Sequence, residues 1–242
     1  MKEVTELLRS DAAFSSQMLR LANSSLYGFT SQIDSVLHAT VILGLERVKG
    51  LTLTVAMGRY QKAAMKIGVL RRCWRHSLAC ALLSEELAAA CSIHKDRAYT
   101  GGIIHDIGRL GLLVAYPNEY ANLLSVAAEN SFDVIECERQ LFDIDHCAAG
   151  RWLAEEWKFP SEFAEIAARH HDEEQARAFD MISLVRHGCL LADTLGFEIV
   201  KPLRNWSFEE LRAQLPEAAQ ARFQQDPEEL KERINSRINP LD

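Results

Sequence analysis

The sequence has no long apolar run. Its apolar stretches, such as Leu110–Ala115, are short and interrupted, whereas a helix needs about 20 consecutive apolar residues to span a bilayer. The first residues, MKEVTELLRSD, are too polar for a signal peptide. We therefore expect a cytoplasmic protein without a membrane partner.

A basic arm or stripe is also missing. The chain carries 27 Lys and Arg against 34 Asp and Glu, a net charge of −7. A nucleic-acid-binding surface needs clustered positive charge. The charge therefore argues against nucleic acid as a partner.

Paired cysteines are absent as well. The six cysteines lie far apart and form no Cys-x-x-Cys pair. This pattern favours buried or free thiols in a reducing compartment over disulfides or a zinc site.

What the sequence does have is helical periodicity. Its composition is ordinary for a globular protein, with 48% hydrophobic residues. Apolar residues recur three and four positions apart in nearly every segment, which is the period of an amphipathic helix. This predicts an all-α fold, with helices over residues 3–23 (one helix or two), 35–45, 46–62, 70–91, 97–107, 110–114, 118–129, 133–142, 145–157, 161–171 and 180–195. Four aromatic residues are assigned to the core: Trp74, Trp152, Trp157 and Phe159.

Capping residues mark some of the helix ends. Asp96 is a candidate N-cap for the helix over 97–107, with Gly108 near its end. Ser161 is a candidate N-cap directly after Pro160.

The last forty residues carry many charges and few apolar anchors. Ser207 and Glu210 match a capping box, and Asp226 precedes a further helix start. These features predict a helical appendage on the surface.

Seven polar residues interrupt the apolar helices or lie at their ends: His76, His105, Asp106, His146, His170, His171 and Asp193. A helical bundle builds a metal site from inward-facing ligands on several helices. Imidazole and carboxylate ligands suit divalent iron, manganese, zinc or nickel, and a set without thiolate does not favour structural zinc. Adjacent helical residues point about 100° apart, so His105 and Asp106 would serve neighbouring ions or straddle one.

Each of these residues also has a purely structural interpretation. His76 could be a core histidine bonded to a backbone carbonyl, and His146 could cap a helix. Asp193 could hydrogen-bond the loop that follows it. Of the two histidines at 170–171, one would face inward and the other would cover the surface.

Small and basic residues surround the pair at 105–106. Gly101 and Gly102 would let neighbouring helices approach closely. Arg109 and Arg72 carry guanidinium groups suited to phosphate oxygens, although a solvated or salt-bridged face is the commoner setting for an arginine.

Six segments follow one another in a recognisable order, and the last four contain all of the seven polar residues except Asp193: DAAFSSQMLRLANSSLYG (11–28), IDSVLHATVILGLERVKGL (33–51), CWRHSLACALLSEELA (73–88), GGIIHDIGRLGLL (101–113), ERQLFDIDHCAAGRWLAEEWKFP (138–160) and ARHHD (168–172). Their order resembles the HD superfamily of metal-dependent phosphohydrolases. More closely, the chain resembles an HDOD domain, the HD-related output domain of bacterial signalling proteins, over roughly residues 5–197.

The resemblance implies a helical bundle of the HD-domain type. It would consist of an N-terminal helical subdomain (1–66) and an HD-like core (67–197), followed by the appendage (198–242). HDOD domains sit beside receiver or cyclic-dinucleotide modules and are regarded as regulatory or binding modules without an established activity. We therefore expect a bacterial signal-transduction output or adaptor domain, with other signalling domains as partners and a pocket for one or two divalent ions.

The first motif begins close to residue 1, which we interpret as an excised domain or a short natural N-terminus.

The alternative is a metal-dependent phosphohydrolase or phosphodiesterase with a nucleotide or cyclic dinucleotide as ligand. By resemblance, the seven polar residues would hold the ions, with Asp106 and Arg109 as catalytic groups.

Three departures from the enzyme pattern favour the adaptor. HHDEEQARAFD (170–180) lacks the Gly-Tyr-Pro of the HD-GYP phosphodiesterases, and Arg109 replaces the lysine of their HDIGK motif. Arg72 stands where three-metal members carry a glutamate, which disfavours a third ion.

Overall fold

The structure, a computed structural model, describes residues 12–23, 33–62, 68–172 and 179–239. Within these ranges every regular element is a helix and none is a strand, so the all-α prediction is confirmed. No helix in the described part of the chain is both long and apolar enough to cross a membrane.

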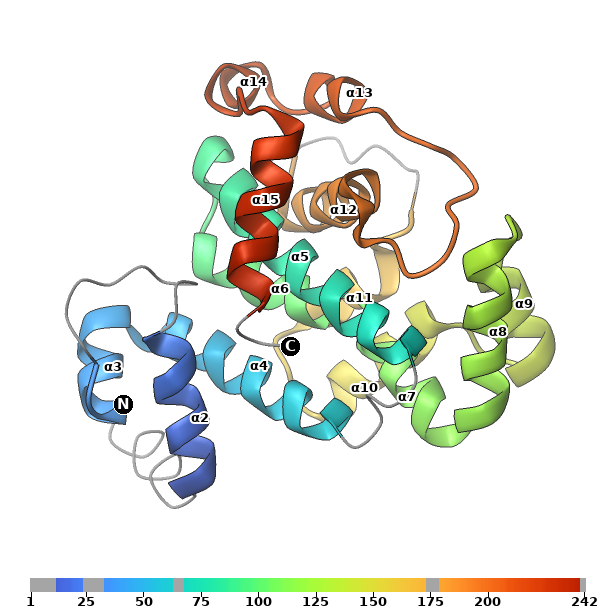
Figure 1. Cartoon of the computed structure of the whole chain (residues 1–242), viewed down its shortest axis with the longest axis horizontal. Helices are drawn as coiled ribbons and strands as arrows, with labels where there is room; N and C mark the ends of the chain where they lie inside the picture. The colour runs from blue at the N-terminus through green and yellow to red at the C-terminus, as the bar shows by residue number, and fades with distance from the viewer. Residues whose placement is uncertain (1–11, 24–32, 63–67, 173–178, 240–242) are drawn as a thin grey trace.

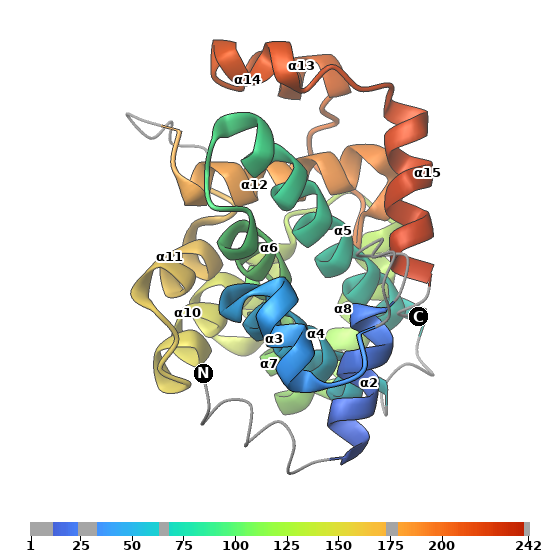
Figure 2. The same ribbon diagram turned by 90° about the vertical axis from the view of Figure 1, so that its left-hand side faces the viewer.

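Three helices form the N-terminal part of the described chain: α2 (Ala12–Ala22), α3 (Val36–Leu43) and α4 (Leu45–Lys62). Ser35 caps α3, because its hydroxyl accepts a hydrogen bond from the backbone N–H of His38 at 3.1 Å. Gly44 has a φ of 78° and turns the chain directly into α4. Figures 1 and 2 show these helices on one flank, where α4 packs against α6. The start of the predicted helix over 3–23 lies outside the described residues.

The central helix is α5 (Gly68–Cys91), which is buried along most of its length. It packs against α6 (Lys95–Ile104) and α12 (Met181–Ala192). At Gly102 a Cβ atom would lie 2.5 Å from Cα of Ala81, so only glycine allows α5 and α6 to cross this closely. The predicted close approach is therefore confirmed at Gly102.

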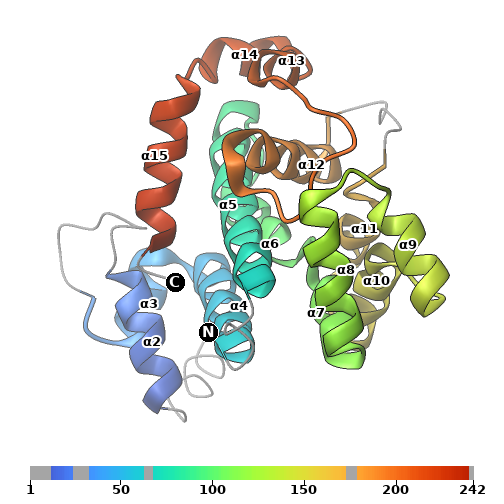
Figure 3. The ribbon, with the colours of Figure 1, turned by 45° about the vertical axis from the view of Figure 1, so that its right-hand side comes forward.

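Five shorter helices complete this half of the molecule: α7 (Ile107–Ala115), α8 (Pro117–Glu129), α9 (Val134–Phe142), α10 (His146–Glu156) and α11 (Ser161–Arg169). A second, smaller apolar cluster lies beneath α8 and α9, around Tyr120, Leu124 and Phe142. Figure 3 shows this helix pair at the edge of the molecule away from α15.

The predicted helix over 97–107 has the wrong ends. It begins at Lys95, after His94 as N-cap, and ends at Ile104, and α7 begins only two residues after His105. Asp96 does not cap it, because its carboxylate lies in the first turn, where it pairs with Arg47 at 2.8 Å.

Ser161 is likewise not an N-cap. It is the first residue of α11, and Pro160 takes the capping position with its carbonyl accepting from the backbone N–H of Phe163 at 2.9 Å.

The C-terminal segment is helical, with α13 (Phe208–Ala213), α14 (Glu217–Arg222) and α15 (Pro227–Ile238). The capping box of Ser207 with Glu210 and the cap at Asp226 are confirmed. The expectation of few apolar anchors underestimates their number, because eight residues here are buried in the main core: Phe208, Leu211, Leu215, Ala219, Phe223, Leu230, Ile234 and Ile238. Helices α14 and α15 cover α5 directly (Figures 1 and 3). The domain boundary before residue 198 stays a prediction.

The aromatic residues divide between core and surface. Trp74 is buried and Phe159 packs against the core. Trp152 and Trp157 are 61% and 51% exposed, so their assignment to the core is wrong. Both line an apolar groove of about 660 Å³ between α4, α7 and α10, whose opening leaves them in contact with solvent.

Candidate metal centre

The predicted ligands come from five places in the fold. His76 lies in the middle of α5, and His105 and Asp106 join α6 to α7. His146 is the first residue of α10, and His170 follows α11. Asp193 opens a short π-helical turn, Asp193–Phe197, after α12. His76, His105, His146 and His170 are at most 3% exposed.

The break between α6 and α7 directs both members of the His-Asp pair inward. Asp106 has φ −101° and ψ 20°, which ends the helical path before α7 starts. In one continuous helix the two side chains would diverge by about 100°. The start of α7 reaches α10 because residue 108 is glycine: a Cβ there would lie 1.8 Å from the carbonyl oxygen of His146.

Fixed partners determine which nitrogen of each imidazole carries the hydrogen. Nδ1 of His105 donates to the carbonyl of Gly102 at 2.7 Å, and Nδ1 of His170 donates to that of Ala167 at 2.9 Å. Nδ1 of His76 lies 3.1 Å from the carbonyl of Phe197. A carbonyl oxygen only accepts, so in each neutral ring Nε2 keeps a lone pair.

These lone pairs point at one another. Nε2 of His105 and Nε2 of His76 are 3.3 Å apart. Nε2 of His170 lies 3.4 Å from Oδ1 of Asp106, and among the described residues neither of these buried atoms has a hydrogen-bond partner. Buried acceptors without a donor cost free energy. A shared proton or a metal cation would satisfy acceptors at these distances.

Burial keeps His76, His105 and His146 neutral. Desolvation lowers the pKa of His76 to about 4 and holds the pKa of His105 well below its ordinary value. It also lowers the pKa of His146. At neutral pH these rings are therefore in the form that binds a metal ion.

Asp106 is held by an ion pair. Arg109 Nε donates to its Oδ2 at 2.9 Å, which leaves Oδ1 facing the Nε2 atoms of His170 and of His146 (3.6 Å). Burial by itself would raise the pKa of Asp106, but Arg109 and the surrounding histidines hold it well below its usual range. Asp106 is thus an anion at the centre of the pocket.

The predicted arginines lie in different settings. Arg109 is buried, and its Nη1 donates to Tyr120 at 3.1 Å and to Glu138 at 3.4 Å, so its guanidinium serves as a salt-bridged internal support. Arg72 is exposed and is not among the residues that line the cavity beside Asp106.

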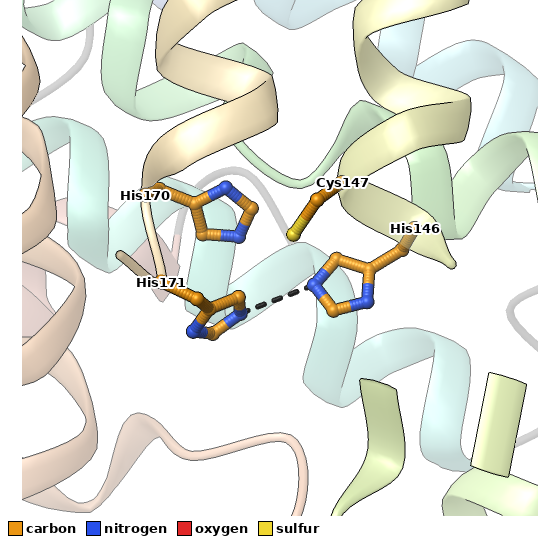
Figure 4. A group of neighbouring side chains, drawn as sticks. All are labelled: His146, Cys147, His170 and His171. Atoms are coloured by element: carbon orange, nitrogen blue, oxygen red, sulfur yellow. Dashed lines mark hydrogen bonds between the residues drawn. The ribbon is translucent and has the colours of Figure 1, made fainter. Parts of the chain in front are cut away.

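The remaining two predicted ligands, His171 and Asp193, lie at the edge of the group of side chains. Nε2 of His171 lies 3.1 Å from Nε2 of His146 (Figure 4), and His171 itself is exposed. Asp193 Oδ1 lies 3.4 Å from Nδ1 of His76, the nitrogen that does not face His105. Burial raises the pKa of Asp193 to about 8.

Sequence reasoning missed three residues around the pocket. Glu138 is fully buried and accepts from Nδ1 of His146 at 2.6 Å and from its backbone N–H at 2.8 Å. Cys147 and Cys189 lie among the histidines. Cys147 follows His146 directly and Cys189 precedes Asp193 by one helical turn, a signal that a search for Cys-x-x-Cys pairs overlooks. All six cysteines are free thiols, as predicted, and Cys147 and Cys189 lie close enough to histidines to be candidate ligands.

Three groups of side chains bring potential ligand atoms within 4.8 Å of one another. They are His146, Cys147, His170 and His171; His76, His105 and Cys189; and His105, Asp106 and His170. Beside them lies a cavity of about 220 Å³. The donor types and the unsatisfied lone pairs fit one or two divalent cations.

The described fold also occurs in known structures. An HDOD domain protein of unknown function from Geobacter sulfurreducens is 21% identical over 99% of this chain and 83% of its own, with a TM-score of 0.74. A Marinobacter aquaeolei protein, provisionally named for signal transduction, is 20% identical over all of this chain and 54% of its own, with a TM-score of 0.73. A Shewanella amazonensis protein, provisionally named a metal-dependent phosphohydrolase, is 20% identical over all of this chain and 85% of its own, with a TM-score of 0.64.

One curated relative is similar in sequence. It is an uncharacterised protein of Treponema pallidum, 23% identical over 177 residues. The match takes in 71% of this chain and 34% of the relative, so the chain spans about a third of that protein's length.

The family model for the HDOD domain matches residues 1–173, well over half of the chain. The match includes the His-Asp junction, the start of α10 and the paired histidines after α11, whereas α12 and Asp193 lie beyond it. The chain belongs to the HDOD domain family.

Proposed function

We propose that this chain is an output or adaptor module of bacterial signal transduction whose histidine–aspartate pocket binds divalent metal. The observation that carries the metal proposal is that electron-pair donors face one another. Nε2 of His76 lies 3.3 Å from Nε2 of His105, and Nε2 of His170 lies 3.4 Å from Oδ1 of Asp106. The similarity to a protein provisionally named for signal transduction supports the role as a module.

In this proposal His76, His105, Asp106, His146 and His170 hold the ions, one or two in number. Carbonyl oxygens and Glu138 bond to Nδ1 of the imidazole rings, on the side away from the proposed ions. Such bonds orient metal-binding histidines and increase their basicity. His171 and Asp193 are the outer members of the set. Partner modules, such as receiver or cyclic-dinucleotide domains, would contact the surface of this domain.

The test is the metal content of protein purified without added metal. We expect near-stoichiometric iron, manganese, zinc or nickel, and we expect His105→Ala or Asp106→Ala to lose it. His38→Ala is the matched control, because His38 is more exposed and pairs with Asp34 outside the pocket. Metal-free wild-type protein that also fails to take up any of these ions would refute the proposal.

A second candidate is a phosphohydrolase, favoured by one feature of the cavity. Its wall joins Asp106 and the histidines to the cationic side chains of Arg186, Lys201 and Arg204, which suit an anionic ligand. A bound ion would supply Lewis-acid activation. Asp106 would hold that ion, and Arg109 would keep Asp106 oriented through the bond at 2.9 Å.

The two candidates differ in a direct assay. Metal-loaded protein is incubated with cyclic dinucleotides and with a generic phosphodiester. Hydrolysis that His105→Ala abolishes and His38→Ala retains would establish the enzyme. Full metal loading without turnover would leave the adaptor as the function.

A further inference from the structure

Two cysteine thiols form part of the pocket wall. Cys189 lies on α12 with 3% of its surface exposed, and its Sγ is 3.5 Å from Nε2 of His76. Cys147, the second residue of α10, is 9% exposed. Figure 4 shows its sulfur pointing into the space between the rings of His146 and His170.

The spacing at Cys189 matches that of ligands around one ion. Zinc bonds to nitrogen are about 2.0–2.1 Å and zinc bonds to sulfur about 2.3 Å, so a tetrahedral site separates two nitrogens by about 3.3 Å and a nitrogen from a sulfur by about 3.6 Å. Nε2 of His76 lies 3.3 Å from Nε2 of His105 and 3.5 Å from Sγ of Cys189.

A simple thiol hydrogen bond explains less of this arrangement. The Cys189 S–H could donate to Nε2 of His76, but Nε2 of His105 would still face that atom without a hydrogen between them. A cation enclosed by the three atoms satisfies both nitrogens and the sulfur at once.

Another buried cysteine shows a different environment. Cys80 lies one turn after His76 on α5 and is fully buried. Its Sγ contacts the carbonyl of Val185 at 3.7 Å and the hydroxyl of Ser84 at 3.9 Å, and it belongs to none of the three groups of potential ligands. Cys80 therefore shows that a cysteine can be buried in this core without lying among the histidines, as Cys189 does.

We propose that Cys189 and Cys147 are metal ligands, which makes this a mixed histidine–cysteine centre. Cys189 binds with His76 and His105, and Cys147 binds with His146, His170 and His171. Thiolate ligands select zinc and iron over magnesium and manganese. The inference rests on the proposed metal binding and names the class of ion: a thiophilic divalent cation.

The experiment is a Co²⁺ titration of the metal-stripped full chain, followed by ultraviolet and visible absorption. Bound thiolate gives a sulfur-to-cobalt charge-transfer band in the near ultraviolet, which nitrogen and oxygen ligands do not give. We expect this band in the wild-type protein and in Cys80→Ser. We expect the double variant Cys147→Ser/Cys189→Ser to lose the band and to bind Zn²⁺ at least about 10-fold more weakly.

Two results overturn the inference, and they are distinguishable. If the wild-type protein binds Co²⁺ without the charge-transfer band, metal binding stands and the cysteine ligands are refuted. If it binds none of Co²⁺, Zn²⁺, Fe²⁺, Mn²⁺ and Ni²⁺, the proposed metal binding fails as well. The wild-type spectrum gives this answer even if the double variant does not fold.

Discussion

One carboxylate, Glu138, connects the pocket to the helices around it. One oxygen accepts from Nδ1 and the backbone N–H of His146, and the other accepts from the hydroxyl of Tyr120 at 2.7 Å. Burial alone would raise its pKa, but His146 and Arg109 lower it to about 2. Glu138 is therefore a buried anion whose removal leaves Arg109 with less compensating charge.

We predict that Glu138→Ala lowers the free energy of unfolding by about 3–5 kcal/mol, the cost of breaking a buried charged pair. The measurement is urea unfolding followed by circular dichroism. Glu136→Ala on the same helix is the control, because Glu136 is exposed and should cost no more than about 0.5 kcal/mol. Equal losses in the two variants would show that Glu138 does not support the pocket.

At the scale of elements, the contact between α7 and α10 positions the pocket. Asp106 precedes α7 and His146 begins α10, so the distance between these helix starts sets the distance between two predicted ligands. Gly108 controls that distance, because a Cβ there would collide with the backbone of His146.

We predict that Gly108→Ala destabilises the protein by about 3 kcal/mol or more, since the collision is with backbone atoms and overpacking typically costs about 1–3 kcal/mol. It should also weaken metal binding by moving Asp106 away from His146. Denaturant unfolding and a metal titration measure the two effects.

Gly68→Ala is the control for this substitution. A Cβ at Gly68 meets nothing within 4 Å, so this variant should be neutral or slightly more stable. If Gly108→Ala behaves in the same way, the two helices have room to move apart and the contact does not position the pocket.

At the scale of the whole molecule, the predicted ligands connect helices that are distant in sequence. An ion held by His76, His105 and Cys189 would join α5, α6 and α12, and one held by His146 and His170 would join α10 and α11. Unfolding would then require loss of the metal, so a bound metal would stabilise the folded chain by mass action.

We predict that Zn²⁺ at 100 times its dissociation constant stabilises the fold by about 2.7 kcal/mol. For a chain of this size this corresponds to a rise in Tm of about 5–10 °C. Thermal unfolding with and without metal measures the shift, and His105→Ala should abolish it. An equal shift in His105→Ala would place the stabilising ion elsewhere.

Much of this fold could be predicted from local pattern. The apolar period located α5 and α9 to within two residues, because helices buried on one face repeat their apolar residues regularly. The break after Ile104 was missed, and the close contact of Gly108 with α10 just beyond it is a long-range feature that no local signal reports. The histidine contacts of Cys189 and Glu138 were missed because their partners lie 113 and 8 residues away in sequence, although the spacing of Cys189 from Asp193 was a local sign of its position.

The exposure of two tryptophans has a practical consequence. Trp152 and Trp157 stand on and just after α10, the helix that begins with His146, and both border the apolar groove next to α4. Trp74 is buried in the core, and Trp206 lies beneath the guanidinium of Arg204. The emission spectrum of the native protein therefore combines two solvent-exposed indoles with two shielded ones. Any event that closes the groove would shift the exposed component to shorter wavelength, so the unlabelled protein carries its own fluorescent reporter for that face.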